Sequence, residues 1–345
     1  MIKFLVYIAI LLLVIAFAQL IRVFELAAQL KGNKPQEITE KDNRMNARLM
    51  ILFLLGFFAF TFWQLIKYKD KLLPVSASEH GVTLDWLFNF NMIIIAFVFI
   101  VTHIVLFYFA FKYYGRQNRT ATFFPHNNKL ELIWTVIPAI VLAVIIIYGL
   151  KAWNEIMKPA EPNSMVIELY AKQFDWTARY SGKDNKLGET NYKLIDGVNA
   201  LGMDSTSEAG ADDIIVKNEI HIPKGRDISF KFRSRDVIHS AFFPHFRAQM
   251  NCVPGMTTMF HFKPTITTAE MRVITKNDKF DYILLCNKIC GASHYNMQMN
   301  IVVDTEEDFQ KWMGKQKPFY GKVTTAMLAK PKSEEPATAT EHKSE

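Results

Sequence analysis

The first 150 residues contain long apolar stretches, each 18 to 20 residues in length, at residues 4–21, 49–66, 92–111 and 132–150. A helix needs about 20 residues to cross about 30 Å of hydrocarbon. A buried helix of a soluble core would show a polar stripe with a period of 3.6 residues, and residues 132–142 show none. The pattern therefore predicts four membrane-spanning helices in the N-terminal half.

Beyond about residue 163 the pattern changes to short segments in which apolar and polar residues alternate. These segments are residues 164–171, 227–232, 256–262 and 300–304. Turns rich in Gly, Pro and Asn separate them, which is typical of an antiparallel β-sandwich or barrel. We also expect a long loop or insertion at residues 181–212, a short helix at 305–318 and a disordered tail from Lys330 onward.

The first apolar stretch has two interpretations, because residues 16–18 (Ala-Phe-Ala) resemble the cleavage site of a secretory signal. The basic residues favour a retained helix. Lys and Arg concentrate in loops 22–48 and 112–129, whereas loop 67–90 carries only three Lys. In membrane proteins Lys and Arg are enriched in the cytoplasmic loops, so loops 22–48 and 112–129 are expected on the cytoplasmic side. Four retained helices therefore place the N-terminus and everything after residue 150 outside the membrane.

Charge is distributed unevenly along the 345 residues, which carry a formal net charge of +7. Residues 1–150 hold 14 basic and 8 acidic side chains, whereas residues 151–345 hold 26 and 25. The basic excess thus belongs to the membrane loops and not to a folded surface that could follow a phosphate backbone. Nucleic acid is not an expected partner. Three cysteines are too few for a scaffold built on disulfides.

The most specific chemical pattern lies in residues 286–297 (CNKICGASHYNM). Four side chains in this segment are of types that bind soft metals: Cys286, Cys290, His294 and Met297. A further candidate ligand, His239, lies upstream in residues 236–240 (DVIHS). Two thiolates, two imidazoles and a thioether favour copper.

Two other interpretations of this segment remain open. Cys286 and Cys290 could form a disulfide in an oxidising compartment. Alternatively, the set could be a zinc site with two Cys and two His ligands, in which Met297 only packs. The third cysteine, Cys252, has no partner at a fixed spacing, and we expect it to be a small buried apolar residue.

Three sequence blocks resemble subunit II of haem-copper cytochrome c oxidases. They are residues 131–139 (ELIWTVIPA), residues 236–240 followed by 252–255 (CVPG), and residues 286–297. The resemblance covers about residues 80–304 and implies a two-helix membrane hairpin followed by an all-β, cupredoxin-like barrel. The expected domains are an N-terminal extension with two predicted transmembrane helices (1–78), the hairpin (79–155), the copper domain (160–305), a C-terminal helix or extension (306–329) and the disordered tail (330–345).

The resemblance implies a dinuclear, mixed-valence copper centre of the CuA type. By position, Cys286 and Cys290 would bridge both ions, and His239 and His294 would each bind one. Met297 would complete the ligands of one ion, and the backbone carbonyl of Lys288 those of the other. In the family this centre accepts electrons from a c-type cytochrome and passes them to haem in subunit I, where oxygen is reduced to water and protons are pumped. The implied partners are subunits I and III, the cytochrome and the lipid bilayer of a bacterial plasma membrane, with the copper domain outside.

Several positions depart from the family pattern. Lys288 stands where the family usually has a Glu that helps to hold a magnesium ion. Phe174 stands where it usually has a Trp thought to admit electrons, although Trp176 is close by. Lys288 and Arg247 suggest a less negative field near the metal than is usual. A less negative field would attract a soluble basic cytochrome less strongly, and the two additional helices could contact another membrane protein. Together these features suggest that the electron donor is a cytochrome domain held in a membrane complex.

Glu131 matches an acidic position that the family associates with proton uptake into subunit I. The alternative is an interfacial carboxylate that the dipole of the helix N-terminus favours.

The sequence distinguishes an oxidase subunit from two other functions. A quinol oxidase subunit II would lack the copper ligands, and a membrane-anchored copper-delivery protein would have no need of the helix sequence at residues 131–139. The soluble nitrous oxide reductase shares the copper loop but lacks such a hairpin. No Cys-Xaa-Xaa-Cys-His occurs, so the chain carries no c-type haem of its own.

Overall fold

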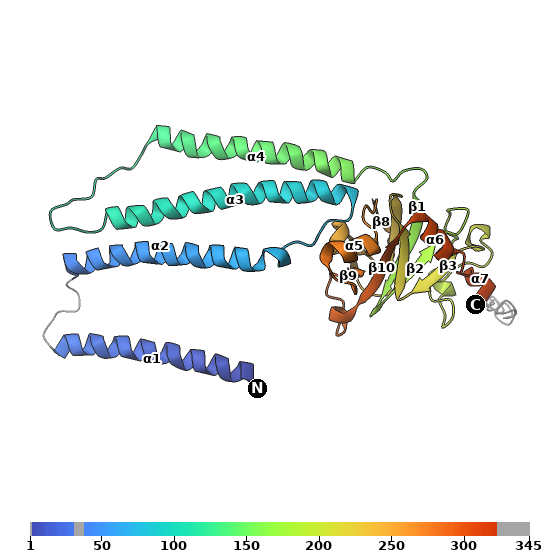
Figure 1. Ribbon diagram of the computed structural model, residues 1–345, viewed down its shortest axis with the longest axis horizontal. Coiled ribbons are helices and arrows are strands. Elements are labelled where there is room, and N and C mark those ends of the chain that lie inside the picture. Colours follow the sequence, from blue (N-terminus) through green and yellow to red (C-terminus); the bar gives the residue numbers. More distant parts are fainter. Residues whose placement is uncertain (1, 31–37, 323–345) are drawn as a thin grey trace, which may run out of the picture. The chain divides into compact units, whose positions relative to one another are not determined.

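The computed structural model describes residues 2–30 and 38–322 (Figure 1). Long helices occupy the N-terminal half: α1 (Ile2–Leu30), α2 (Glu40–Tyr68), α3 (Glu79–Lys112) and α4 (Asn128–Ile156). All four are long and apolar enough to cross a membrane, as the sequence predicts. Each helix is longer than its apolar stretch, because the residues that flank the stretch are also helical. The tail predicted to be disordered lies outside the described residues.

The chain forms two compact units whose boundary falls inside α3 and α4. One unit contains the residues up to Leu72 together with Met92–Ile137, and the other contains Leu73–Asn91 and the residues from Pro138 onward. The first turns of α3 and the C-terminal part of α4 therefore belong to the same unit as the β-strands.

Within this second unit, α3 and the segment before it contact the turn that follows β6 (His239–Phe243). The guanidinium of Arg247 donates to both carboxylate oxygens of Asp85, at 2.7 and 2.9 Å. The hydroxyl of Ser78 donates to the carbonyl of Phe246 at 2.7 Å. These contacts hold the start of α3 against the turn that follows β6.

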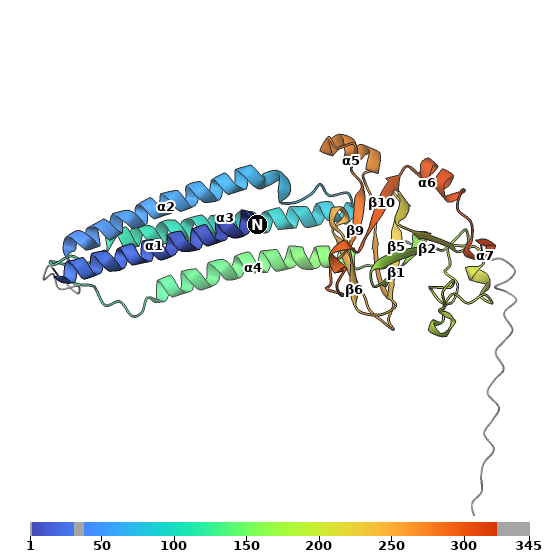
Figure 2. The same ribbon diagram turned by 90° about the horizontal axis from the view of Figure 1, so that it is seen from below.

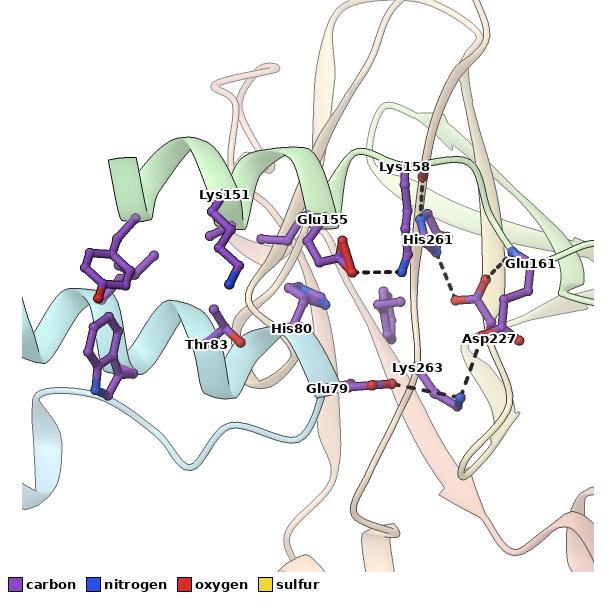
Figure 3. A pocket seen from close by; sticks show the side chains of 16 residues that line it. Glu79, His80, Thr83, Lys151, Glu155, Lys158, Glu161, Asp227, His261 and Lys263 are labelled. Atoms are coloured by element: carbon purple, nitrogen blue, oxygen red, sulfur yellow. Dashed lines mark hydrogen bonds and ion pairs between the residues drawn. The ribbon is translucent and has the colours of Figure 1, made fainter. Parts of the chain in front are cut away.

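A cavity of about 460 Å³ lies between the N-terminal turns of α3, the C-terminal part of α4 and the strands (Figure 3). Lys151 projects from α4 and His80 from α3, while Lys263 forms ion pairs with Glu79 and Glu161 at 3.9 and 3.8 Å. Charged side chains from both helices and from the strands thus meet at this junction.

The strands form two five-stranded sheets. The first has the order β3–β2–β1–β5–β8 and contains β1 (Met165–Lys172), β2 (Asp175–Tyr180), β3 (Ile214–Lys217), β5 (Ile228–Ser234) and β8 (Thr258–Phe262). The second has the order β4–β10–β9–β6–β7 and contains β4 (Glu219–Pro223), β6, β7 (Ala248–Cys252), β9 (Tyr282–Cys286) and β10 (Gln298–Asp304). Alternate residues of both sheets, among them Ile167, Phe230 and Leu284, form one buried core. The expected all-β, cupredoxin-like domain after a helical N-terminal half is confirmed.

The expectation of a purely antiparallel arrangement is wrong for two strand pairs. β1 runs parallel to β5, and β4 runs parallel to β10, whereas the other pairs are antiparallel. A parallel pair needs a long connection between its strands. Here the chain forms β2, β3 and β4 between β1 and its parallel partner β5. The alternation of apolar and polar residues within a strand does not reveal which distant strand it pairs with.

Residues 181–212 form the predicted loop, which includes the short 3-10 helices η2 (Tyr192–Leu194) and η3 (Glu208–Gly210). The predicted C-terminal helix is α6 (Glu306–Met313), which begins after the N-cap Thr305 and lies beside β10 (Figure 2). Two further helices, α5 (Thr268–Thr275) and α7 (Phe319–Lys322), were not predicted.

Candidate metal centre

The second sheet and the loop after β9 bring the predicted ligands together. His239 is the first residue of β6 and pairs in register with Cys252 on β7. Cys286 is the last residue of β9, and its N–H donates to the carbonyl of Met297 at 3.0 Å. Because β9 and β10 are antiparallel neighbours, the loop between them must return to its starting point. This closure folds Cys290 and His294 back over the strand end.

The side chains converge on one point. Sγ of Cys286 lies 3.8 Å from Sγ of Cys290 and 3.8 Å from Nδ1 of His239. Sγ of Cys290 lies 3.6 Å from Nδ1 of His294 and 3.9 Å from Sδ of Met297. The ligand atoms of His239, Cys286 and Cys290 all lie within 4.8 Å of one another.

The backbone supplies a sixth possible donor atom. The carbonyl oxygen of Lys288 lies 3.3 Å from Sγ of Cys286, so it faces the cluster, while the residue as a whole is exposed. His239, Cys286, Cys290 and Met297 are buried. The site is therefore largely shielded from solvent.

The turn between β1 and β2 supports the loop. Nε2 of Gln173 donates to the carbonyl of Cys290 at 2.5 Å. Gly291 has φ +139°, and a Cβ at this position would lie 2.7 Å from Cζ of Phe174 and 2.9 Å from Nε2 of Gln173. A glycine is needed here because the backbone conformation and the close approach both exclude a larger residue. Sequence reasoning missed this role of Gln173.

Asp236 orients the candidate ligand His239. Its Oδ1 lies 2.8 Å from Nε2 of the imidazole, and its Oδ2 accepts from the N–H of Gln173 at 2.8 Å. Burial opposes ionisation of this carboxyl group, but the hydrogen bonds from Gln173, His239 and Val237 outweigh it and lower the pKa of Asp236. Nε2 is thus engaged, which leaves Nδ1 for the cluster.

The thiol of Cys290 needs a nearby cation to become a thiolate at neutral pH. Burial, followed by the adjacent Cys286, raises the pKa of Cys290 to about 11. A bound metal ion deprotonates a coordinating thiol outright. Burial likewise raises the pKa of Cys252 to about 12, and no part of this side chain is exposed. Its expected role as a small buried residue is confirmed.

The donor set fits two soft metal ions. Two sulfurs, two imidazole nitrogens, a thioether and a carbonyl exceed the four ligands of a structural zinc site. All three cysteines are free in the structure, so the disulfide interpretation gains no support. Thiolate and thioether donors are the ligands that copper prefers.

The aromatic residues proposed for electron transfer differ in exposure. Trp176 is completely buried, and its ring lies 6.3 Å from that of the ligand His239 in an edge-on arrangement. Phe174 is partly exposed and packs against the core beside Gly291. The two residues therefore line the region between the surface and the ligands.

Two charged residues singled out in the sequence have partners of their own. Arg247 is paired with Asp85, so a carboxylate lies directly beside its charge. Glu131 lies in the first turn of α4, where Oε1 accepts from the N–H of Asn127 at 3.4 Å while Oδ1 of Asn127 accepts from the N–H of Leu130 at 3.0 Å. Its carboxylate thus contributes to the N-terminal cap of this helix.

A ligand cluster at one end of a β-sandwich that follows apolar helices defines a membrane-anchored protein of the cupredoxin-like class. The chain belongs to the family of cytochrome c oxidase subunit II. The family model described as "Cytochrome C oxidase subunit II, transmembrane domain" matches residues 61–152, and that of the periplasmic domain matches residues 165–305. The chain is accordingly a subunit of a haem-copper oxidase.

Curated relatives agree with this assignment. The chain is 32% identical over 240 residues to the alternative cytochrome c oxidase subunit 2 of Bradyrhizobium diazoefficiens, a match that covers 69% of this chain and 82% of the relative. It is 28% identical to cytochrome c oxidase subunit 2 of Thermostichus vulcanus, over 73% of this chain and 80% of the relative.

Solved structures show more distant likeness. The periplasmic domain of subunit II of the cytochrome oxidase of Bradyrhizobium japonicum matches with 21% identity and a TM-score of 0.30, over 46% of this chain and 94% of that one. A chain of a haem-copper terminal oxidase dimer matches with 18% identity and a TM-score of 0.30, over 51% of this chain and 98% of that one.

Proposed function

We propose that this chain is the electron-accepting subunit of a cytochrome c oxidase and binds two copper ions in a centre of the CuA type. The convergence of six donor atoms around two sulfurs 3.8 Å apart carries the proposal. The proposed ligands are Cys286, Cys290, His239, His294, Met297 and the carbonyl of Lys288. Copper held by these residues would supply one-electron transfer.

The protein supplies the position and the environment of the ligands. Asp236 holds His239 by Nε2, and Gln173 holds the loop by the carbonyl of Cys290. Rigid ligands keep the geometry similar in both redox states, so little reorganisation accompanies electron transfer. Burial of the sulfurs excludes water and competing ligands.

Electrons would come from a c-type cytochrome and would leave to haem in subunit I, where oxygen is reduced to water and protons are pumped. Phe174 and Trp176 are the proposed residues of electron uptake, since one reaches the surface and the other contacts His239. The exposed Lys288 disfavours a strongly basic soluble donor. We infer that the donor is a cytochrome domain held in a membrane complex.

The proposed setting is a bacterial plasma membrane, with the copper domain on the outer side and subunits I and III as partners. The basic loops of the sequence support this orientation. Glu131, at the start of α4, would then lie at the cytoplasmic side, where it is the proposed residue of proton uptake.

The full chain in detergent, loaded with copper, tests the function. We expect two copper ions for each chain and, in the partly oxidised protein, an electron paramagnetic resonance signal from one electron shared between two nuclei. A single isolated copper signal, or one zinc ion in protein isolated from its host, would contradict the proposal.

A further inference from the structure

A second cavity, of about 780 Å³, lies on the face of the first sheet that points away from the core. Ile167 and Leu169 of β1 point into the core, so Glu168 and Tyr170 lie on the opposite face, together with Arg233 of β5. Parts of the loop 181–212 form the other wall. The metal centre uses none of these residues.

Buried ion pairs tie the loop to the sheet. Arg179 is 1% exposed and pairs with Asp213 and Glu168, and its Nη2 donates to the carbonyl of Gly188 at 2.7 Å. Arg233 pairs with Glu168 and donates to Thr190 Oγ1 at 2.6 Å. Two guanidinium groups thus balance two carboxylates, and this network contributes no net charge to the cavity.

Three polar groups that line the cavity have no partner among the residues that the structure describes. The side chains of Lys231 and Arg235 form neither a hydrogen bond nor an ion pair there. Tyr170 is only 5% exposed, yet its hydroxyl has no hydrogen bond within the described chain. The ring of Tyr170 is buried, but its hydroxyl oxygen is open to the cavity, so it is available to donate a hydrogen bond to a molecule bound there.

The charges around this hydroxyl identify the kind of ligand. Arg233 lies over the ring of Tyr170 at 5.1 Å, and the hydroxyl is under the influence of the positive charges of Arg233 and Arg235 and of the negative charges of Glu168 and Asp236. Glu189 is the one carboxylate of the lining outside the buried network, and it is exposed. Two free cations and a free hydroxyl donor suit an anion that carries several oxygen acceptors.

We propose that this cavity binds a small organic or inorganic polyanion through phosphate or carboxylate oxygens, held by Lys231, Arg235 and the hydroxyl of Tyr170. The volume lies within the range of about 300–1,000 Å³ that is usual for small-molecule sites. The loop 181–212 then has a function of its own, as the wall of a binding site outside the electron-transfer path.

Calorimetric titration of the full chain in detergent tests the site, with pyrophosphate, citrate and adenosine triphosphate as separate probes at constant ionic strength. We expect at least one probe to bind with a stoichiometry of one. Lys231→Gln and Arg235→Gln should each weaken binding about tenfold, because each removes a charged donor. Lys217→Gln, on the same sheet but outside the cavity lining, is the matched control and should leave the affinity unchanged.

Tyr170→Phe separates binding from folding. Its hydroxyl has no partner in the free chain, so the variant should unfold at the same temperature as the wild type or higher, while it binds the probe about fivefold more weakly. The proposal is overturned if no probe binds below 1 mM, or if Lys217→Gln weakens binding as much as Lys231→Gln. Binding of an acidic peptide when all three probes fail would assign the cavity to a protein partner and overturn it as well.

Discussion

The carboxylate of Asp236 lies 2.8 Å from Nε2 of His239, on the side of the ring that faces away from the cysteines. The two residues are three apart, so the chain entering β6 carries both the ligand and the group that orients it. A carboxylate partner makes an imidazole a better donor to a metal.

Replacement of Asp236 by Asn should keep the hydrogen bond and remove the charge. We expect copper to remain bound with an affinity about 10–100-fold lower, and the reduction potential to rise because the oxidised centre loses a nearby negative charge. Competition with a copper chelator and a redox titration would measure the two effects. An unchanged potential would show that the carboxylate only positions the ring.

The three cysteines allow a matched comparison. Cys286→Ser should abolish the two-copper signal, because it removes a bridging sulfur, whereas Cys252→Ser should retain two ions. The sulfur of Cys252 is not among the ligand atoms that lie together at the site, so its thiol does not compete for metal. Copper stoichiometry and the resonance spectrum of each variant give the answer, and loss of the signal in Cys252→Ser with the fold intact would contradict the assigned ligand set.

Glu131→Gln should slow turnover of the assembled oxidase without altering the copper spectrum. The carboxylate also caps α4, so a slower rate could arise from a disturbed helix start. Asn127→Ala is the control, because it removes the acceptor for the Leu130 N–H and keeps the acid. Equal slowing in both variants would favour the structural role over proton uptake.

The identity of the electron donor can be tested by ionic strength. We expect slow oxidation of a soluble basic cytochrome c with a weak salt dependence, and faster turnover with the native donor in membranes. Lys288 at the exposed edge of the copper loop supports this expectation. Fast oxidation of the soluble cytochrome that falls steeply with salt, at a rate equal to that of native membranes, would refute it.

His245 should make the β-domain less stable at mildly acidic pH. Burial, followed by the charge of Arg247, lowers the pKa of this ring to about 4, and Nδ1 is buried without a hydrogen bond among the described residues. The unfolded chain takes up this proton near pH 6.5, so stability should fall as the pH falls from about 6.5 to about 4 and then level off. The loss should be roughly 2 kcal/mol, because the ring is only partly shielded from solvent.

A variant isolates this contribution. His245→Phe keeps the edge-on ring contacts with Phe280 and Tyr282 and cannot be protonated. Thermal unfolding of the full chain, followed by near-ultraviolet circular dichroism from pH 7 to pH 4, should show a smaller decline in the variant. Parallel curves for both proteins would contradict the prediction.

Sequence patterns could predict the helices and most of the side chains that meet at the candidate metal site, because these depend on local signals. Apolar length defines the spans, and Cys286, Cys290, His294 and Met297 lie in one loop. The parallel strand pairs and the support of the loop by Gln173 could not be predicted, since they join residues that are far apart in the chain. The compensation of Arg247 by Asp85, 162 positions earlier, was missed for the same reason.

The ion pair between Asp85 and Arg247 limits how far the anchor and the copper domain are interchangeable. Arg247 also donates to the carbonyl of Pro74. A chimera that joined residues 160–305 to an unrelated membrane anchor would lose both acceptors and leave a largely buried guanidinium without its carboxylate. A change in the helix at Asp85 therefore acts on the turn that follows β6, the strand that begins with the candidate ligand His239.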